Sequence, residues 1–364
     1  MKLLRTPDDM PPSVPLEAYQ GEATDGAPIT AYSGIESTPD FLRRAIPPRY
    51  IVDGVIQANR LYSLCGFTGH AKTSLALKLA FCVARGVVFG DKETEQGSVL
   101  FLAGENADNV ITQYQALLIA KGVKPESVPV FWHYGNFRLK DSMAALKADA
   151  ENIPDLRLII VDTLQAFFPG DNDNDNMQML EAARQFRPLN SLPGNPTVIV
   201  LCHPSGKRPD KSNLVPRGGG AFLNEVDGNF SVWRDADGAI TLHTQGKHRG
   251  AWFDPMVFKI EERSFDEIAD AKGRPIPQAV VRVLLVSEQV EAKKSRESLE
   301  SHILRAIERN ANISVRALAH DLNIGKTGAA NLVSEMVEQR LVKRSAGKLF
   351  LTEKGSKMLS DAGL

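Results

Sequence analysis

Hydrophobic and polar positions follow two alternating periods along the central part of the chain. Short runs that are almost wholly apolar are typical of strands buried on both faces of a parallel sheet. They occupy residues 61–65, 98–103, 128–133, 156–161 and 197–202. Between these runs, apolar residues recur with helical spacing, as over 108–121 and 143–150. Strands that alternate with helices in this way predict an α/β fold, a mostly parallel twisted sheet with helices on both faces.

Three later strands and two flanking regions complete the predicted organisation. Residues 229–234, 240–245 and 256–260 are expected to be antiparallel strands that finish the sheet. The predicted divisions are a flexible leader (1–45), the α/β domain (46–262), a linker that ends in a charged segment (263–297) and a C-terminal domain (298–364).

The C-terminal domain has a pattern of its own. A helix over 299–309 precedes Ser314, the predicted N-cap of a helix over 315–322, and a third helix follows over 326–340. Two short strands around a turn and a helix over 353–359 come next. Helices followed by a hairpin in this order resemble a winged helix-turn-helix domain.

The stretch from Leu61 to Gly86 carries the strongest chemical signal. A strand, a glycine-containing turn and a helix follow one another, and such a turn points backbone N–H groups and the positive end of the helix dipole at an anion. Lys72 is placed to reach the β- and γ-phosphates of ATP, and the Thr73 hydroxyl to bind Mg²⁺. The predicted nucleotide-binding residues are Gly66, Phe67, Thr68, Gly69, His70, Ala71, Lys72, Thr73 and Ser74. The alternative is a chance Gly-Lys-Thr turn before a core helix.

This loop departs from the G-x-x-x-x-G-K-[ST] pattern at one position. Gly66, Lys72 and Thr73 match, but Ala71 stands where the last glycine is expected. Because alanine tolerates positive φ poorly, we expect Ala71 either to hold an ordinary backbone angle or to be strained. The loop is then expected to bind nucleotide less tightly than a glycine version.

A buried carboxylate is expected beside this loop. The apolar run 156–161 leads into Asp162, as a parallel strand does when it delivers an acid to the carboxyl edge of a sheet. Asp162 is predicted to hold Mg²⁺, directly or through water, and the alternative is a helix N-cap. The following GDNDNDN segment resembles a calcium loop but has Asn176 and Ala182 where that loop needs Gly and Glu. We interpret it as a solvated loop that caps the next helix.

Composition limits the remaining choices. The 364 residues are 43% hydrophobic and 24% charged, with a net charge of −1, which is typical of a soluble protein and argues against a globally basic nucleic-acid coat. No run approaches 18 apolar residues, and the N-terminus has no signal-like apolar core, so we predict a cytoplasmic protein with no membrane partner. Cys65, Cys82 and Cys202 lack metal-ligand spacing and are predicted to be reduced core residues.

Taken together, residues 46–262 resemble a RecA-like ATPase core, in particular the RepA and replicative-helicase branch with its hexameric rings. Gly66 to Thr73 is similar to the Walker A element, and Asp162 is similar to the Walker B aspartate. The resemblance covers about 60% of the chain and rests on features in the expected order.

The resemblance implies catalytic roles for four residues besides Lys72. Glu105 would polarise the attacking water, and His203 would sense the γ-phosphate. Lys247 and Arg249 are similar to the K-x-R fingers that ring helicases insert into the neighbouring subunit's site. The alternatives are a helix-capping Glu105, a core or turn His203, and a solvated hairpin for the two cations.

Contacts to DNA are expected from the sheet edge and from the C-terminal domain. Arg217 precedes three glycines in a polar loop and is either a nucleic-acid contact, a sensor or an ordinary surface residue. The C-terminal candidates are Lys326, Thr327, Asn331, Lys343, Arg344 and Lys348. Glu335 and Glu338 weaken the electrostatic argument. The alternative is a domain that docks protein or is purely structural.

The leading hypothesis is a Mg²⁺-dependent ATPase that acts on DNA, a helicase-like replication protein of a plasmid, phage or other mobile element. The resemblance implies a homo-oligomer, with a hexamer favoured, single-stranded DNA passing through the ring and duplex DNA bound by the winged helix. The alternative is a nucleotide-controlled DNA-binding regulatory protein with little turnover, which Ala71 favours and Glu105 opposes.

Overall fold

The computed structural model describes residues 34–43, 45–170, 172, 175–205, 211–218, 220–235, 238–284 and 286–361. The chain divides after Pro47 into two units, which are described separately. In the first unit, helix α1 (Thr38–Leu42) begins after Ser37, whose hydroxyl accepts a hydrogen bond from the Asp40 backbone. The predicted flexible leader therefore contains one short helix, and its residues 1–33 lie outside the described part.

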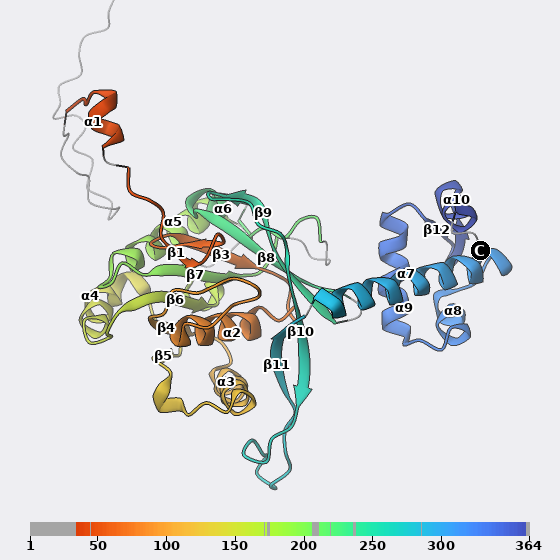
Figure 1. Cartoon of the computed structure of the whole chain (residues 1–364), viewed down its shortest axis with the longest axis horizontal. Coiled ribbons are helices and arrows are strands. Elements are labelled where there is room, and N and C mark those ends of the chain that lie inside the picture. Colours follow the sequence, from red (N-terminus) through yellow and green to blue (C-terminus); the bar gives the residue numbers. More distant parts are fainter. Residues whose placement is uncertain are drawn as a thin grey trace, which may run out of the picture. The chain divides into compact units, whose positions relative to one another are not determined.

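A nine-stranded mixed sheet organises the second unit, in the order β11-β10-β9-β8-β3-β7-β6-β4-β5 (Figure 1). Six neighbouring strands run parallel. They are β3 (Leu61–Cys65), β4 (Ser98–Ala103), β5 (Val130–Tyr134), β6 (Leu156–Asp162), β7 (Thr197–Cys202) and β8 (Gly228–Arg234). A separate antiparallel pair, β1 (Tyr50–Val52) and β2 (Ile56–Gln57), precedes them. The predicted mostly parallel sheet is confirmed.

Helices cover both faces of the sheet, because alternate residues of each strand point to opposite sides. One apolar core packs α2 (Lys72–Arg85) and α3 (Ala107–Lys121) against strand residues such as Val99 and Phe101. The other packs α4 (Leu139–Ala150), α5 (Asn176–Phe186) and α6 (Ala221–Glu225) against residues such as Leu100 and Leu102. Short 3-10 helices lie at Pro125–Ser127, Leu164–Phe167 and Arg187–Ser191. The cysteines Cys65, Cys82 and Cys202 are buried and reduced, as predicted.

Two details of the predicted sheet are wrong. Strand β8, expected to be antiparallel, runs parallel to β3, because the chain reaches it through α6 on one face of the sheet and so re-enters from the amino edge. The sheet also continues past residue 262. After β9 (Ala239–His248) and β10 (Met256–Arg263), an unpredicted strand β11 (Gln278–Val283) pairs with β10, inside the segment expected to be a linker.

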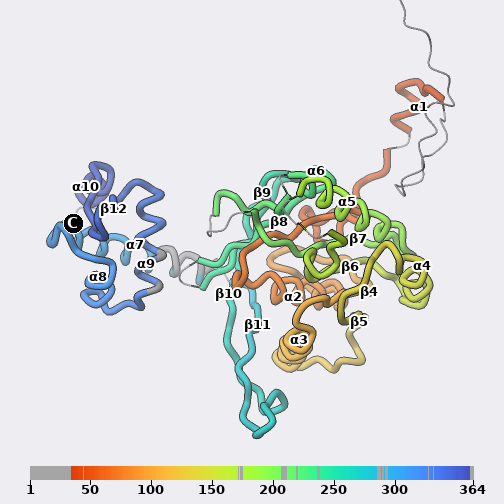
Figure 2. Tube along the Cα trace, turned by 180° about the vertical axis from the view of Figure 1, so that it is seen from behind, coloured from red at the N-terminus to blue at the C-terminus, as the bar shows by residue number. Residues whose placement is uncertain are grey.

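Strand β11 belongs to the same apolar core as the helices of one face. Its Val280 and Val281 are buried in the cluster that contains Val110 and Tyr114 of α3. Seen from behind in Figure 2, α3 lies beside β11. The α/β domain therefore extends about twenty residues beyond its predicted boundary.

The C-terminal residues form their own core. The elements are α7 (Val286–Arg309), α8 (Val315–Asp321), α9 (Lys326–Glu338), β12 (Val342–Ser345), β13 (Lys348–Leu351) and α10 (Glu353–Asp361). The Ser314 hydroxyl accepts a hydrogen bond from the Ala317 backbone at 3.2 Å, as its predicted N-cap role requires. The charged segment expected to end the linker is instead the first half of the 24-residue α7.

Within the described ranges, no helix combines the length and the apolar character that crossing a bilayer requires.

Candidate functional site

The turn between β3 and α2 is a tightly packed loop at the carboxyl edge of the sheet. The Gly66 backbone N–H donates to the Cys202 carbonyl of β7 at 3.3 Å. A Cβ at Gly66 would lie only 2.8 Å from the Val232 carbonyl oxygen of β8, which explains why glycine stands there. The loop is therefore held between β7 and β8, directly above the end of β3.

Ala71 is the strained residue of this loop. Its φ of 67° and ψ of 25° place it in the left-handed region, immediately before α2 begins at Lys72. Of the two outcomes expected for Ala71, strain is the one observed. The loop keeps the conformation that suits glycine, at a cost of about 1 kcal/mol for the alanine side chain.

The Lys72 ammonium lies beneath the loop and is buried, with 7% of the residue exposed. It donates to the Gly66 carbonyl at 2.7 Å and to the Phe67 carbonyl at 3.2 Å. Burial lowers the Lys72 pKa, an effect opposed by the nearby Asp162 and Glu105 carboxylates. The cation is thus held close to the backbone that would cradle a phosphate chain.

Asp162 ends β6 beside this lysine and is 2% exposed. Burial raises its pKa to about 6, and the Glu105 charge adds to the rise, while a hydrogen bond from the Thr73 hydroxyl opposes it. The structure thus brings together the hydroxyl and the carboxylate that were predicted to hold Mg²⁺. One hydroxyl and one carboxylate, completed by phosphate oxygens and water, are a donor set that suits this ion. Groups of three or more His, Cys, Asp or Glu that could hold a metal are absent from the described residues.

Glu105 follows β4 at the same edge and is partly exposed. The Thr163 hydroxyl donates to Glu105 Oε1 at 2.8 Å, so the residue after Asp162 orients this second carboxylate. Thr163 was not predicted from the sequence, because its partner lies 58 positions away.

His70 joins the loop to β8, a role that sequence reasoning missed. Its Nδ1 accepts a hydrogen bond from the Arg234 backbone N–H at 3.1 Å. Its ring packs edge-on against Trp233, with 4.8 Å between the ring centroids. Burial lowers the His70 pKa, which favours the neutral ring that this contact needs. The phosphate loop and the end of β8 are therefore connected directly.

His203 and Arg217 lie at the same edge, after β7. The Arg217 backbone N–H donates to the His203 carbonyl at 3.3 Å, and the Arg217 Nε donates to the Pro204 carbonyl at 3.1 Å. Burial raises the pKa of the Cys65 thiol at the base of the phosphate loop, and the positive charge of Arg217 opposes this rise. Because β7 stands between β3 and β6, both residues are placed near the predicted nucleotide.

Lys247 and Arg249 lie at the opposite edge. They stand at the end of β9, where His248 pairs with Gly228, the first residue of the parallel strand β8. Gly66 lies beside Val232, four residues along β8 from Gly228, so about 13 Å of strand separates this edge from the start of the phosphate loop. These two side chains therefore cannot reach the phosphates of their own subunit.

The C-terminal candidates are only partly described. Lys326, Lys343, Arg344 and Lys348 are exposed, the last three on the β12–β13 pair. The side chains of Thr327 and Asn331 lie outside the described part. Glu335 of α9 forms an ion pair with Arg296 of α7, so one of the two acids that opposed DNA binding is neutralised.

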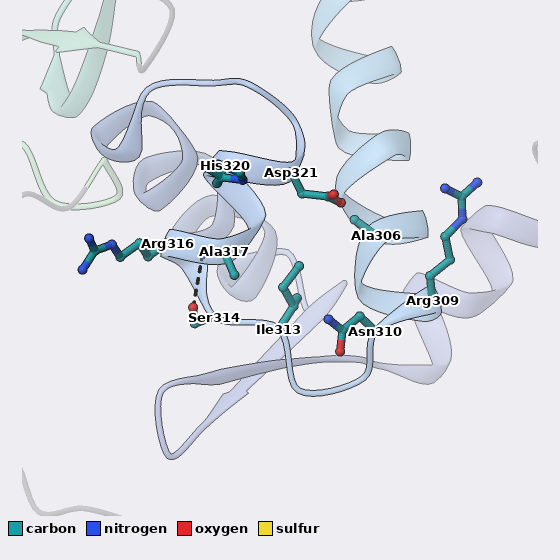
Figure 3. A pocket seen from close by; sticks show the side chains of 9 residues that line it. All are labelled: Ala306, Arg309, Asn310, Ile313, Ser314, Arg316, Ala317, His320 and Asp321. Carbon is teal, nitrogen blue, oxygen red and sulfur yellow. Dashed lines mark hydrogen bonds between the residues drawn. The ribbon is translucent and has the colours of Figure 1, made fainter.

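A cavity of about 700 Å³ lies between the end of α7 and α8 (Figure 3). Its Arg309 and Arg316 side chains point away from each other and out of the cavity. Since the two arginines do not converge on one point, the cavity has no arrangement that would hold an anion.

Comparison with known proteins agrees with this geometry. Residues 36–209 match the family model described as "AAA domain", which spans the phosphate loop, Glu105, Asp162 and His203. No match was found among curated proteins. With the mainly parallel sheet, the match supports a P-loop nucleotide hydrolase of the AAA type. It ends before Arg217, Lys247 and Arg249, and the roles of all the site residues stay predictions.

Replacing Ala71 by glycine is expected to stabilise the protein. Glycine adopts the observed left-handed angles without strain but adds freedom to the unfolded chain, so the free energy of unfolding should rise by about 0.5–1 kcal/mol. Denaturant unfolding without nucleotide measures this. As a matched control, Ala76→Gly inside α2 should destabilise by about 1 kcal/mol or more. Equal effects of the two substitutions would contradict strain at Ala71.

Replacing Asp162 by asparagine should stabilise the nucleotide-free protein at high pH. Because the folded-state pKa is raised above the unfolded value, the carboxylate costs stability above about pH 6, and this cost fades as the pH falls toward 3.8. Asp162→Asn should therefore raise the free energy of unfolding by about 2–3 kcal/mol at pH 8 and by less at pH 5. Chemical unfolding in EDTA at the two pH values measures this, and a gain that is larger at pH 5 would show that the sign is wrong.

Proposed function

We propose that this protein is an oligomeric, Mg²⁺-dependent ATPase that acts on DNA and hydrolyses ATP at interfaces between its subunits. The observation that carries the proposal is the division of the predicted catalytic residues between the two edges of one sheet. Lys72, Asp162 and Glu105 converge at the carboxyl edge, and Lys247 and Arg249 stand at the amino edge. A second copy that presents its amino edge to this site would complete it.

The proposed chemistry is divided between the residues of the phosphate site and Arg249 of a neighbouring subunit. Phosphoryl transfer depends on positioning and charge stabilisation more than on covalent steps. The loop N–H groups and Lys72 would hold the β- and γ-phosphates, and Glu105, oriented by Thr163, would accept a proton from the attacking water. Bound Mg²⁺ would neutralise phosphate oxygens from its place at Thr73 and Asp162. Arg249 of a neighbour would stabilise the charge that develops on the transferred group.

The action on DNA is supported by the C-terminal residues. Lys343, Arg344 and Lys348 gather on one exposed hairpin, where cations would contact phosphates without reading sequence. We therefore propose a helicase-like replication protein of a plasmid, phage or other mobile element, with a ring of six subunits favoured. A regulatory DNA-binding protein with little turnover is the second candidate, favoured by the strain at Ala71.

Replacing Glu105 by glutamine separates these two candidates. Glutamine keeps an oxygen that can accept the Thr163 hydrogen bond but is no base, so steady-state hydrolysis should fall about 10²-fold or more, with and without single-stranded DNA. ATP binding, followed with a fluorescent analogue, should be unchanged, whereas Lys72→Ala should abolish it. Glu105→Gln protein that hydrolyses ATP at the parent rate would remove the enzyme assignment.

Mixing two inactive variants tests hydrolysis at interfaces. Arg249→Ala subunits keep an intact phosphate site, and Lys72→Ala subunits keep an intact arginine, so mixed oligomers should regain part of the turnover that each variant lacks alone. Recovery is measured as ATP hydrolysis against the mixing ratio. If the mixture hydrolyses ATP no faster than the separate variants at any ratio, Arg249 does not act across an interface.

A further inference from the structure

Asp227 pairs with two arginines, Arg187 and Arg249, at the amino edge of the sheet, and their side chains differ in exposure. It precedes β8, and 9% of its side chain is exposed. Its Oδ2 accepts from Arg187 at 2.6 Å and from the Leu61 backbone N–H at 3.0 Å. Its Oδ1 faces an Arg249 nitrogen at 3.5 Å. One oxygen is thus committed to the fold, and the other is turned toward the predicted finger.

The two arginines differ in how firmly they are held. The Arg187 side chain is 36% exposed and also donates to the Glu225 carbonyl. The Arg249 side chain is 67% exposed, and its contact with Asp227 is long. Exposed pairs of this kind contribute little to stability and break readily. Arg187 is therefore a permanent counter-ion of Asp227, and Arg249 is a partner that can leave.

The backbone places Arg249 at this carboxylate as well. The Arg249 N–H donates to the Asp227 carbonyl at 2.9 Å, and the Asp227 N–H donates to the Leu61 carbonyl at 2.7 Å. Asp227 therefore ties the start of β3 to the residue that follows β9. Lys247 stands in the same cluster, where it donates to the Asn224 carbonyl.

We infer that Asp227 is a positioning residue for Arg249, holding its guanidinium ready for the phosphates of a second copy of this chain. This inference rests on the proposed function, because it requires Arg249 to act across an interface. Arg187 has a separate role in this arrangement, since it keeps the buried Asp227 carboxylate paired when Arg249 moves to the neighbour's phosphates. Without the Asp227 charge, the exposed Arg249 side chain would sample many rotamers.

Replacing Asp227 by asparagine tests this. Asparagine keeps an oxygen for the Leu61 N–H and Arg187 but loses the attraction for Arg249. We expect kcat to fall about tenfold with the KM for ATP unchanged, because the phosphate site of the same subunit is intact. Asp254→Asn, an exposed aspartate five positions after Arg249, is the matched control and should hydrolyse ATP at the parent rate.

Subunit mixing distinguishes positioning from a merely structural role. Lys72→Ala subunits carry intact Asp227 and Arg249, so they should restore turnover at the phosphate sites of Asp227→Asn subunits. A structural defect within the Asp227→Asn subunit would not be repaired by its neighbour. Asp227→Glu keeps the charge but displaces it by one methylene. The kcat of Asp227→Glu should fall less than that of Asp227→Asn, and Lys72→Ala subunits should restore its turnover in the same way. This variant replaces the asparagine variant in the test if the latter fails to fold.

The outcomes are separable from those of the proposed function. If Arg249→Ala mixtures recover and Asp227→Asn mixtures do not, Asp227 does not position the finger, although the finger itself stands. Parent-rate hydrolysis by Asp227→Asn would also overturn the inference. If Arg249→Ala mixtures fail to recover, the hypothesis of catalysis between subunits is lost, and the inference is lost with it.

Discussion

The hydrogen bonds from the buried Lys72 ammonium to the Gly66 and Phe67 carbonyls are the interaction on which the site depends. A buried cation needs partners, and here the loop backbone provides them. The same ammonium lies near Asp162 and Glu105, so the loop, the end of β6 and the end of β4 meet around one charge. A phosphate chain would enter a place already arranged for anions, with the acids beside it available to an ion and a water molecule.

The convergence of these residues was predictable from the sequence because it follows from the strand pattern. Nearly continuous apolar runs predict parallel strands, and parallel strands bring their carboxyl ends to one edge. Asp162 comes directly after such a run, one residue separates Glu105 from the end of another, and Lys72 begins the helix that follows a third. Local pattern and global fold agree here, so the meeting of these side chains needed no knowledge of long-range contacts.

What the sequence did not reveal depends on contacts between distant segments. The direction of β8 is decided by the connection before it, which carries the chain back across the sheet to the amino edge, and no local pattern records that crossing. The partners of the Asp227 carboxylate are Arg187, Arg249 and Leu61, which lie 40, 22 and 166 positions away in the sequence. His70 joins a strand 164 positions later. The segment expected to be a linker contains the first half of the helix α7, in which Arg296 pairs with Glu300.

Strand β8 lies beside both groups of predicted catalytic residues. At its carboxyl end the Arg234 backbone holds His70 of the phosphate loop, and at its amino end Asp227 holds Arg249. In the proposed assembly, one strand of each subunit would therefore contact both the loop that binds its own nucleotide and the arginine that it offers to its neighbour.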